Sequence, residues 1–182
     1  MKFIFIILLF FSFNVSAKTT KTFEQQVEEA TKLGLAYIMT NLYLEGSKHT
    51  IEKCSDEYRG YDSKTKTFIG DSINKMIYRN FLTEAIFEQY TDEEYGEEVT
   101  KITVNSLNNQ IELELELSID DLEQEIKKLK LEKFCEDSIQ YHGFWLRNAE
   151  DASLQFLKDI KKFNPNFDID EKRLEEKLAK NK

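Results

Sequence analysis

The stretch DSINKMIYRNFLTEAIFEQY, residues 71–90, predicts a helix that packs on several sides. Its apolar residues recur every three or four positions, as they do on one face of a helix, yet they cover more than half of the circumference. They are Ile73, Met76, Ile77, Phe81, Leu82, Ala85, Ile86 and Phe87. A helix with so wide an apolar surface is typical of a central position, so we expect a mostly α-helical, bundle-like domain built around it.

A first helix is predicted N-terminal to this segment. Thr22 and Gln25 have the spacing of a capping box, in which each side chain accepts a hydrogen bond from the other residue's backbone N–H. Apolar residues then continue at helical spacing towards Gly46, which is a natural stop. Residues 46–67 are polar and rich in turn residues, so we expect a loop with one short helical turn around Cys54.

Three further helices are predicted in the second half of the chain. Apolar residues at helical spacing indicate a helix over 118–137 and, after a break at Gly143, another over 144–163. Asn164–Pro165 should end the latter, because proline cannot continue the hydrogen-bond ladder and restricts the residue before it. A short charged helix from about 170 to 180 follows.

Residues 99–117 fit two structures. In IELELEL, residues 111–117, apolar residues alternate with glutamates, and this period of two favours a small β-hairpin with an acidic outer face. The alternative is a helix, because Leu and Glu are strong helix formers and a second apolar stripe has helical spacing. That stripe consists of Val104, Leu107, Ile111, Leu115, Ile119 and Leu122. Since Ser118, Asp120 and Asp121 form a good helix start, and a helix should not restart in mid-run, we expect the hairpin.

Residues 1–17 predict a cleavable secretory signal peptide. Lys2 supplies the positive start, residues 3–13 are almost entirely apolar, and residues 15–17 are the small-residue exit that signal peptidase needs. The apolar run is too short for a membrane anchor, because a spanning helix needs about 20 apolar residues. We therefore expect one exported domain, residues 18–182, that is periplasmic or secreted and has no membrane span after signal cleavage.

Cys54 and Cys135 predict one disulfide. An even number of cysteines in an exported protein indicates pairing, and two cysteines allow one connectivity. In the chain-entropy model, closing so long a loop stabilises the fold by about 4 to 5 kcal/mol, as an upper estimate. Reactive dithiols usually have C-x-x-C spacing, which this pair lacks, so the predicted role is structural.

The charge balance excludes some classes of partner. The full chain has 25 basic and 34 acidic residues, and removal of Lys2 with the signal peptide leaves 24 against 34, a net charge of −10. Nucleic acids and anionic lipids need a basic surface, so neither is expected as a partner. A basic protein would be attracted to such a chain.

Catalytic chemistry has little support in the sequence. The two histidines are His49 and His142, and a hydrolase would have to combine His142 with Ser138 and the adjacent Asp137. No G-x-S-x-G motif is present. A serine, an aspartate and a histidine this close together in sequence also occur by chance at polar helix ends. We expect a packing or surface role for His142 beside its aromatic neighbours, and predict no catalytic residue.

Metal binding has one weak candidate. Oxygen-bearing residues at 164, 166, 168, 170 and 175 have the spacing of a calcium loop. Ile169, however, stands where that loop needs glycine, and an amide from Asn164 replaces the usual first carboxylate. Asp168 or Asp170 as a helix N-cap explains these residues better, so no metal and no cofactor is predicted.

Two acidic groups are candidate interfaces. Their members are Asp92, Glu93, Glu94, Glu97 and Glu98 in the first group, and Glu112, Glu114 and Glu116 in the second. A solvated face is the default interpretation of such groups, and an electrostatic interface for a cationic protein is the functional one.

Three functional hypotheses follow. The leading one is a non-enzymatic exported protein that binds another envelope or secreted protein, as an inhibitor or immunity factor does, with its acidic face towards a basic partner. The alternative is a periplasmic small-ligand-binding protein in which Tyr141, His142 and Trp145 line a pocket. The third is a hydrolase that uses His142 and Ser138.

Overall fold

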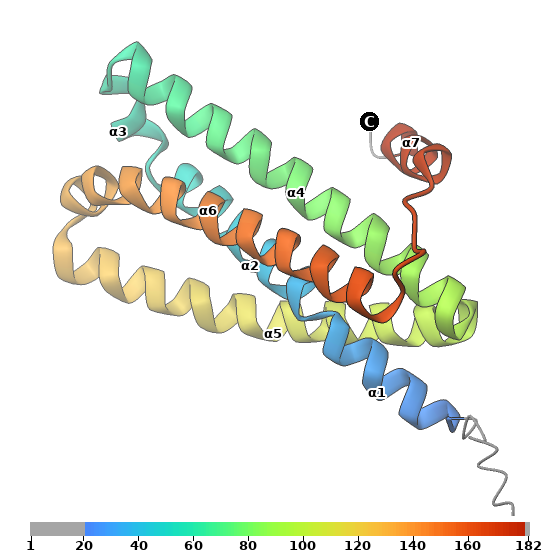
Figure 1. Cartoon of the computed structure of the whole chain (residues 1–182). Helices are drawn as coiled ribbons and strands as arrows, with labels where there is room; N and C mark the ends of the chain where they lie inside the picture. Colours follow the sequence, from blue (N-terminus) through green and yellow to red (C-terminus); the bar gives the residue numbers. More distant parts are fainter. Residues whose placement is uncertain (1–20, 181–182) are drawn as a thin grey trace, which may run out of the picture.

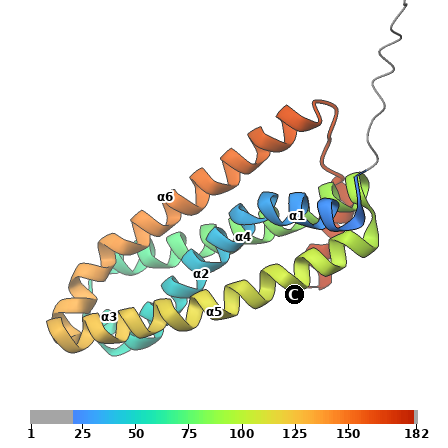
Figure 2. The same cartoon turned by 90° about the horizontal axis from the view of Figure 1, so that it is seen from below.

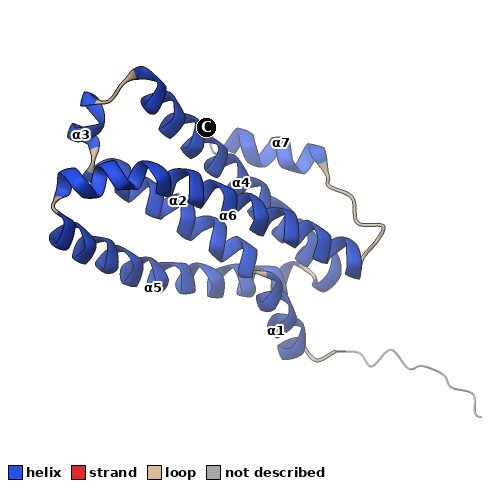
Figure 3. Cartoon of the chain, turned by 60° about the vertical axis from the view of Figure 1, so that its left-hand side comes forward, coloured by secondary structure: helices blue, strands red, loops and turns tan. Residues whose placement is uncertain are grey.

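The computed structural model describes residues 21–180, and 91% of these residues are helical. No strand occurs among them, so the all-α class is confirmed and the hairpin is not present (Figure 3). The elements in chain order are α1 (Phe23–Leu33), α2 (Leu35–Lys53), α3 (Ser55–Gly60), α4 (Ser63–Tyr95), α5 (Glu97–Leu129), α6 (Leu131–Phe163) and α7 (Glu171–Lys180) (Figure 1).

Three long helices build a bundle around α2. Helices α4, α5 and α6 have 33 residues each, which corresponds to about 50 Å of helix. Each of them packs against α2, and α4 also contacts α5 and α6. The segment predicted as a central helix, residues 71–90, is part of α4 and contributes Met76, Ile86 and Phe87 to the core, but the helix at the centre of the bundle is α2. Viewed from below, α5 and α6 diverge from their shared turn (Figure 2).

The first predicted helix begins as expected but is interrupted earlier than expected. The capping box of Thr22 and Gln25 is present, and α1 starts at Phe23. The helix breaks at Gly34, where the Leu107 side chain of α5 packs so closely that an added Cβ would lie 2.3 Å from Leu107 Cδ1. The absence of a side chain at this position lets α5 pack against the junction of α1 and α2.

The predicted stop at Gly46 and the predicted loop 46–67 are wrong. Gly46 is a buried residue inside α2, and only residues 54, 61 and 62 of the supposed loop are outside helices. Glycine costs a helix only about 1 kcal/mol, which the packing of α2 against α6 offsets. The next helix, α4, starts at Ser63, where the carboxylate of Asp62 accepts a hydrogen bond from the Thr65 N–H at 2.9 Å.

The hairpin predicted at 99–117 is wrong because the helical stripe determines the structure. Leu107 and Ile111 are buried, Val104 and Leu115 pack against the same core, and Ser118 is an exposed residue within α5. Leu and Glu favour the helix, and α1, α2, α4 and α6 provide the surface that covers its apolar stripe. The two-residue alternation in 111–117 is incidental to this packing.

The boundaries of the last long helices also differ from the prediction. The expected helix 118–137 is divided at Lys130, whose φ of 66° turns the chain between α5 and α6. The expected break at Gly143 is absent, because this residue lies inside α6, where an added Cβ would be 3.2 Å from Phe68. The predicted stop at 164–165 is confirmed, since α6 ends at Phe163.

The predicted disulfide between Cys54 and Cys135 is confirmed. The two residues are 81 positions apart in sequence and 5.5 Å apart between Cα atoms. The bond ties the junction of α2 and α3 to the start of α6, and both cysteines are fully buried in a small apolar cluster with Tyr58, Ile69 and Phe134. The covalent link therefore closes one end of the bundle.

The predicted signal peptide, residues 1–17, lies outside the described residues. Among the helices that the structure does describe, none combines the length and apolarity that crossing a membrane requires.

Candidate functional site

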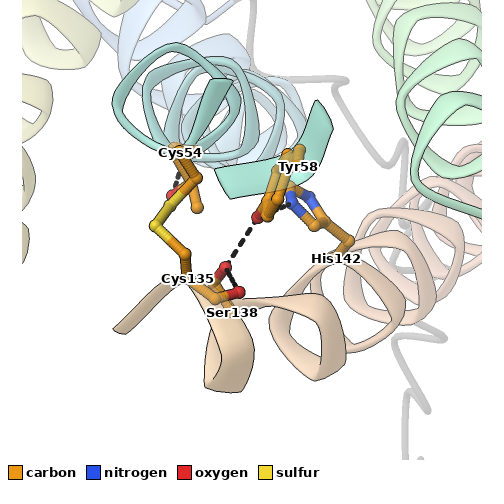
Figure 4. Close-up of a disulfide and its surroundings, with 7 residues drawn as sticks. Cys54, Tyr58, Cys135, Ser138 and His142 are labelled. Carbon is orange, nitrogen blue, oxygen red and sulfur yellow. Dashed lines mark hydrogen bonds between the residues drawn. A yellow bond between two sulfur atoms is a disulfide. The ribbon is translucent and has the colours of Figure 1, made fainter. Parts of the chain in front are cut away.

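A buried hydrogen-bonded chain lies beside the disulfide and is called here the His142 network. Its members are Ser47 of α2, Tyr58 of α3, and Ser138 and His142 of α6. Figure 4 shows Tyr58, Ser138 and His142 beside the Cys54–Cys135 disulfide. The Ser47 Oγ lies 2.7 Å from His142 Nδ1, and the Tyr58 hydroxyl lies 3.1 Å from His142 Nε2 and 2.6 Å from Ser138 Oγ. Tyr58 is 7% exposed, and the other three residues are fully buried.

The direction of each hydrogen bond can be assigned by starting from Ser138, which lies at one end of the His142 network. Ser138 donates its single hydroxyl proton to the Cys135 carbonyl at 2.8 Å, so Tyr58 must donate to Ser138. His142 Nε2–H then donates to Tyr58, and its Nδ1 accepts from Ser47. The neutral imidazole thus satisfies every polar group in the network.

Burial controls the protonation of His142. Removal from water disfavours the charged imidazolium and lowers the pKa of His142 to about 4. Burial also raises the pKa of the Tyr58 hydroxyl, an effect that the hydrogen bond with Ser138 partly offsets. Both groups are therefore neutral at physiological pH.

This geometry does not support the hydrolase that uses His142 and Ser138. Tyr58 separates the two side chains, and no carboxylate is among the hydrogen-bond partners that the structure gives His142. A triad needs a nucleophile that substrate can reach, whereas these residues are sealed between helices. The network joins α2, α3 and α6, which corresponds to the packing role expected for His142.

The first acidic group lies at the turn between α4 and α5. Asp92 accepts a hydrogen bond from Arg173 of α7 at 3.2 Å, and Glu93 accepts one from Gln89 at 2.7 Å. These contacts give two of the five carboxylates intramolecular partners. The other three, Glu94, Glu97 and Glu98, are exposed around Gly96. Glu98 and Glu112 are about 21 Å apart along α5, so the two acidic groups form separate surfaces.

The second acidic group surrounds two exposed leucines. Leu113 and Leu117 are each 63% exposed and, being four residues apart, lie on the same side of α5. On a helix Glu112 and Glu116 lie to one side of this pair and Glu114 to the other, rather than in the single row that a hairpin would give. Within residues 21–180 the structure records no ion pair for these three glutamates. We call these five residues the leucine–glutamate face.

A groove of about 520 Å³ lies between α5 and α6 and is called the α5–α6 groove. Its lining comes from Leu122 and Glu125 of α5 and from Gln140, Tyr141, Phe144, Trp145 and Arg147 of α6. Tyr141 and Trp145, two of the three residues of the pocket hypothesis, are part of this lining. The third, His142, is not, because its ring lies in the buried network.

The second histidine and the candidate calcium loop have other contacts. His49 Nε2 lies 3.4 Å from Glu123, which also pairs with Lys53. Asp170 caps α7 by accepting a hydrogen bond from the Arg173 N–H at 3.1 Å, as the N-cap interpretation predicts. In the part of the chain that the structure describes, no group of three or more His, Cys, Asp or Glu side chains is arranged to hold a metal ion.

Sequence reasoning missed several members of these sites. Ser47 and Tyr58 are far from His142 in sequence, and nothing local indicates that they meet it. The exposure of Leu113 and Leu117 could have been found from the helical stripe, since neither residue belongs to it.

Compared with protein-family models, curated proteins and solved structures, the chain shows no significant match.

Proposed function

We propose that this protein is a non-enzymatic exported protein that binds a basic exported protein through the leucine–glutamate face of α5. The observation that carries the proposal is the exposure of Leu113 and Leu117, 63% each, between glutamates without recorded ion-pair partners in residues 21–180. An apolar centre with a charged rim is the usual anatomy of a protein–protein interface.

The leucines supply the binding energy in this proposal. Full burial of a leucine side chain is worth about 1.5 to 3 kcal/mol, so the surface still exposed on each is worth about 1 to 2 kcal/mol. The glutamates supply attraction and specificity. Glu112 and Glu116 are four residues apart and repel each other, by about 0.2 to 0.5 kcal/mol, and a basic partner would relieve that repulsion.

The proposed compartment has independent support from the covalent structure. A buried disulfide such as Cys54–Cys135 is consistent with an oxidising environment, where exported proteins reside. The signal-peptide pattern of residues 1–17 favours the same compartment.

The test is affinity capture with the oxidised protein, residues 18–182, as bait in an extract of exported proteins from its source. We expect one stoichiometric basic partner that is lost at high salt, because salt screens exposed charges. The double variant L113S/L117S should weaken binding by roughly thirtyfold or more, and E112Q/E116Q should weaken it mainly at low salt.

The matched control is E171Q/E175Q, which removes the same charge from exposed positions of α7. This variant should bind like the unmodified protein. Absence of a partner at both salt concentrations, or a partner that tolerates both α5 variants, would refute the proposal.

A further inference from the structure

Three aromatic side chains meet solvent in the α5–α6 groove. Tyr141, Phe144 and Trp145 share one side of α6 because they are three and four residues apart. The Tyr141 and Trp145 rings are 6.0 Å apart between centroids and inclined by 42°, so they form a corner rather than a flat stack. Phe144 is 52% exposed beside them. Aromatic ring faces in such an arrangement attract cations through the ring quadrupole.

A carboxylate lies at the same end of the groove. Glu125 of α5 accepts a hydrogen bond from the Tyr141 hydroxyl at 3.4 Å, which leaves most of its accepting capacity free. Burial is the main cause that raises the pKa of Tyr141, and the negative charges of Glu125 and Asp137 near its hydroxyl add to this effect. The one basic residue of the lining, Arg147, is six residues beyond Tyr141, about 9 Å along the helix axis, and two residues beyond Trp145, so Glu125 and Tyr141 form the end of the groove away from this positive charge.

We propose that the α5–α6 groove binds a small organic ammonium ligand, whose cation lies over Tyr141 and Trp145 and whose counter-ion is Glu125. The aromatic rings provide an apolar lining that an alkylated ammonium group can contact, and Glu125 balances its charge. The site is separate from the leucine–glutamate face and does not depend on the proposed protein partner.

The chain contains a direct reporter for this site, because Trp145 is its single tryptophan. We would titrate the oxidised protein, residues 18–182, with choline and follow Trp145 emission, with calorimetry as a second readout. The matched ligand is 3,3-dimethylbutan-1-ol, which has nearly the shape of choline without its charge. We expect saturable binding of choline and binding of the neutral ligand that is weaker by about tenfold or more.

Two variants test the assigned roles. Glu125→Gln keeps the shape of the side chain and removes its charge, so it should weaken choline binding by about fivefold or more. Tyr141→Leu should weaken it by a similar factor. Glu175→Gln on α7 removes an equal charge at an exposed residue outside the groove lining and should leave binding unchanged.

Four results would overturn the proposal. They are absence of a choline response in both readouts, equal binding of the neutral ligand, unchanged binding in Glu125→Gln, and binding of a lysine-containing peptide without binding of choline. The last result would identify the groove as a protein-docking surface instead.

Discussion

Acidification from pH 7.5 to pH 5 is expected to destabilise the fold through His142. The folded-state pKa of about 4 lies below 6.5, the ordinary value of a histidine in water, so between these values the unfolded chain binds a proton that the folded chain does not. The free energy of unfolding therefore falls as the pH drops through 6.5 towards 4. Protonation would also place an N–H on Nδ1, where Ser47 now donates, and would force that bond to reverse.

The size of the effect follows from the two pKa values. One pKa unit corresponds to 1.36 kcal/mol, so the full contribution of His142 is about 3 kcal/mol, reached below pH 4. Between pH 7.5 and pH 5 the contribution is about 2 kcal/mol. Carboxylates contribute little to the change over this window, because their ordinary pKa values lie below pH 5. The folded state lowers the pKa values of Glu28, Asp62 and Glu123, so the stability that these three groups provide is lost only at still lower pH.

Urea unfolding at pH 7.5 and pH 5 measures this contribution. Between these two pH values, the free energy of unfolding of the unmodified protein should fall by about 2 kcal/mol more than that of the variant His142→Gln, because glutamine does not titrate at this position. His49→Gln is the matched control, because His49 lies beside Glu123 outside the network, and this variant should retain the response of His142. Equal losses in the unmodified protein and His142→Gln, or an imidazole titration of folded His142 near pH 6.5 by NMR, would refute the reasoning.

Three stability measurements test other features of the fold. Reduction of the disulfide should lower the free energy of unfolding by up to about 4 to 5 kcal/mol, which thermal unfolding with and without reductant would detect. Gly34→Ala should destabilise by about 1 to 3 kcal/mol because of its contact with Leu107, whereas Gly70→Ala, with open space around it in α4, should stabilise by about 0.5 to 1 kcal/mol. Leu107→Ala should lower the free energy of unfolding by about 2 to 5 kcal/mol and Leu113→Ala by less than about 0.5 kcal/mol, because Leu107 is buried and Leu113 is exposed. In a hairpin Leu113 would face the core, and its replacement would then be costly.

Local signals in the sequence predicted what depends on local chemistry. The capping box at Thr22 and the stop at Pro165 follow from the backbone of a few adjacent residues, and both are present. The pairing of Cys54 and Cys135 could be predicted because the chain has only two cysteines and is expected to be exported to an oxidising compartment. In contrast, the hairpin prediction failed because 111–117 satisfies two periodicities, and the choice depends on which neighbours cover the segment.

The glycines show the same limit more clearly. Gly46 is predicted to end a helix and Gly143 to lie in a break between two helices, but they lie within α2 and α6, while Gly34 interrupts a helix that is predicted to continue. A glycine costs only about 1 kcal/mol in a helix, so tertiary packing decides the outcome at each position. Gly34 faces Leu107 of α5 and Gly143 faces Phe68 of α4, and neither neighbour can be inferred from the local sequence.

The continuity of α6 through Gly143 also determines which of the candidate pocket residues line the α5–α6 groove. In a continuous α6, Tyr141 and Trp145 are four residues apart and share a face, whereas His142 is rotated by about 100° from Tyr141. The same helix therefore sends two aromatic rings into the α5–α6 groove and the imidazole into the bundle, where Ser47 and Tyr58 hold it neutral. Trp145 connects the two, because its ring lines the groove on one side and meets the His142 ring edge-on at 5.7 Å between centroids.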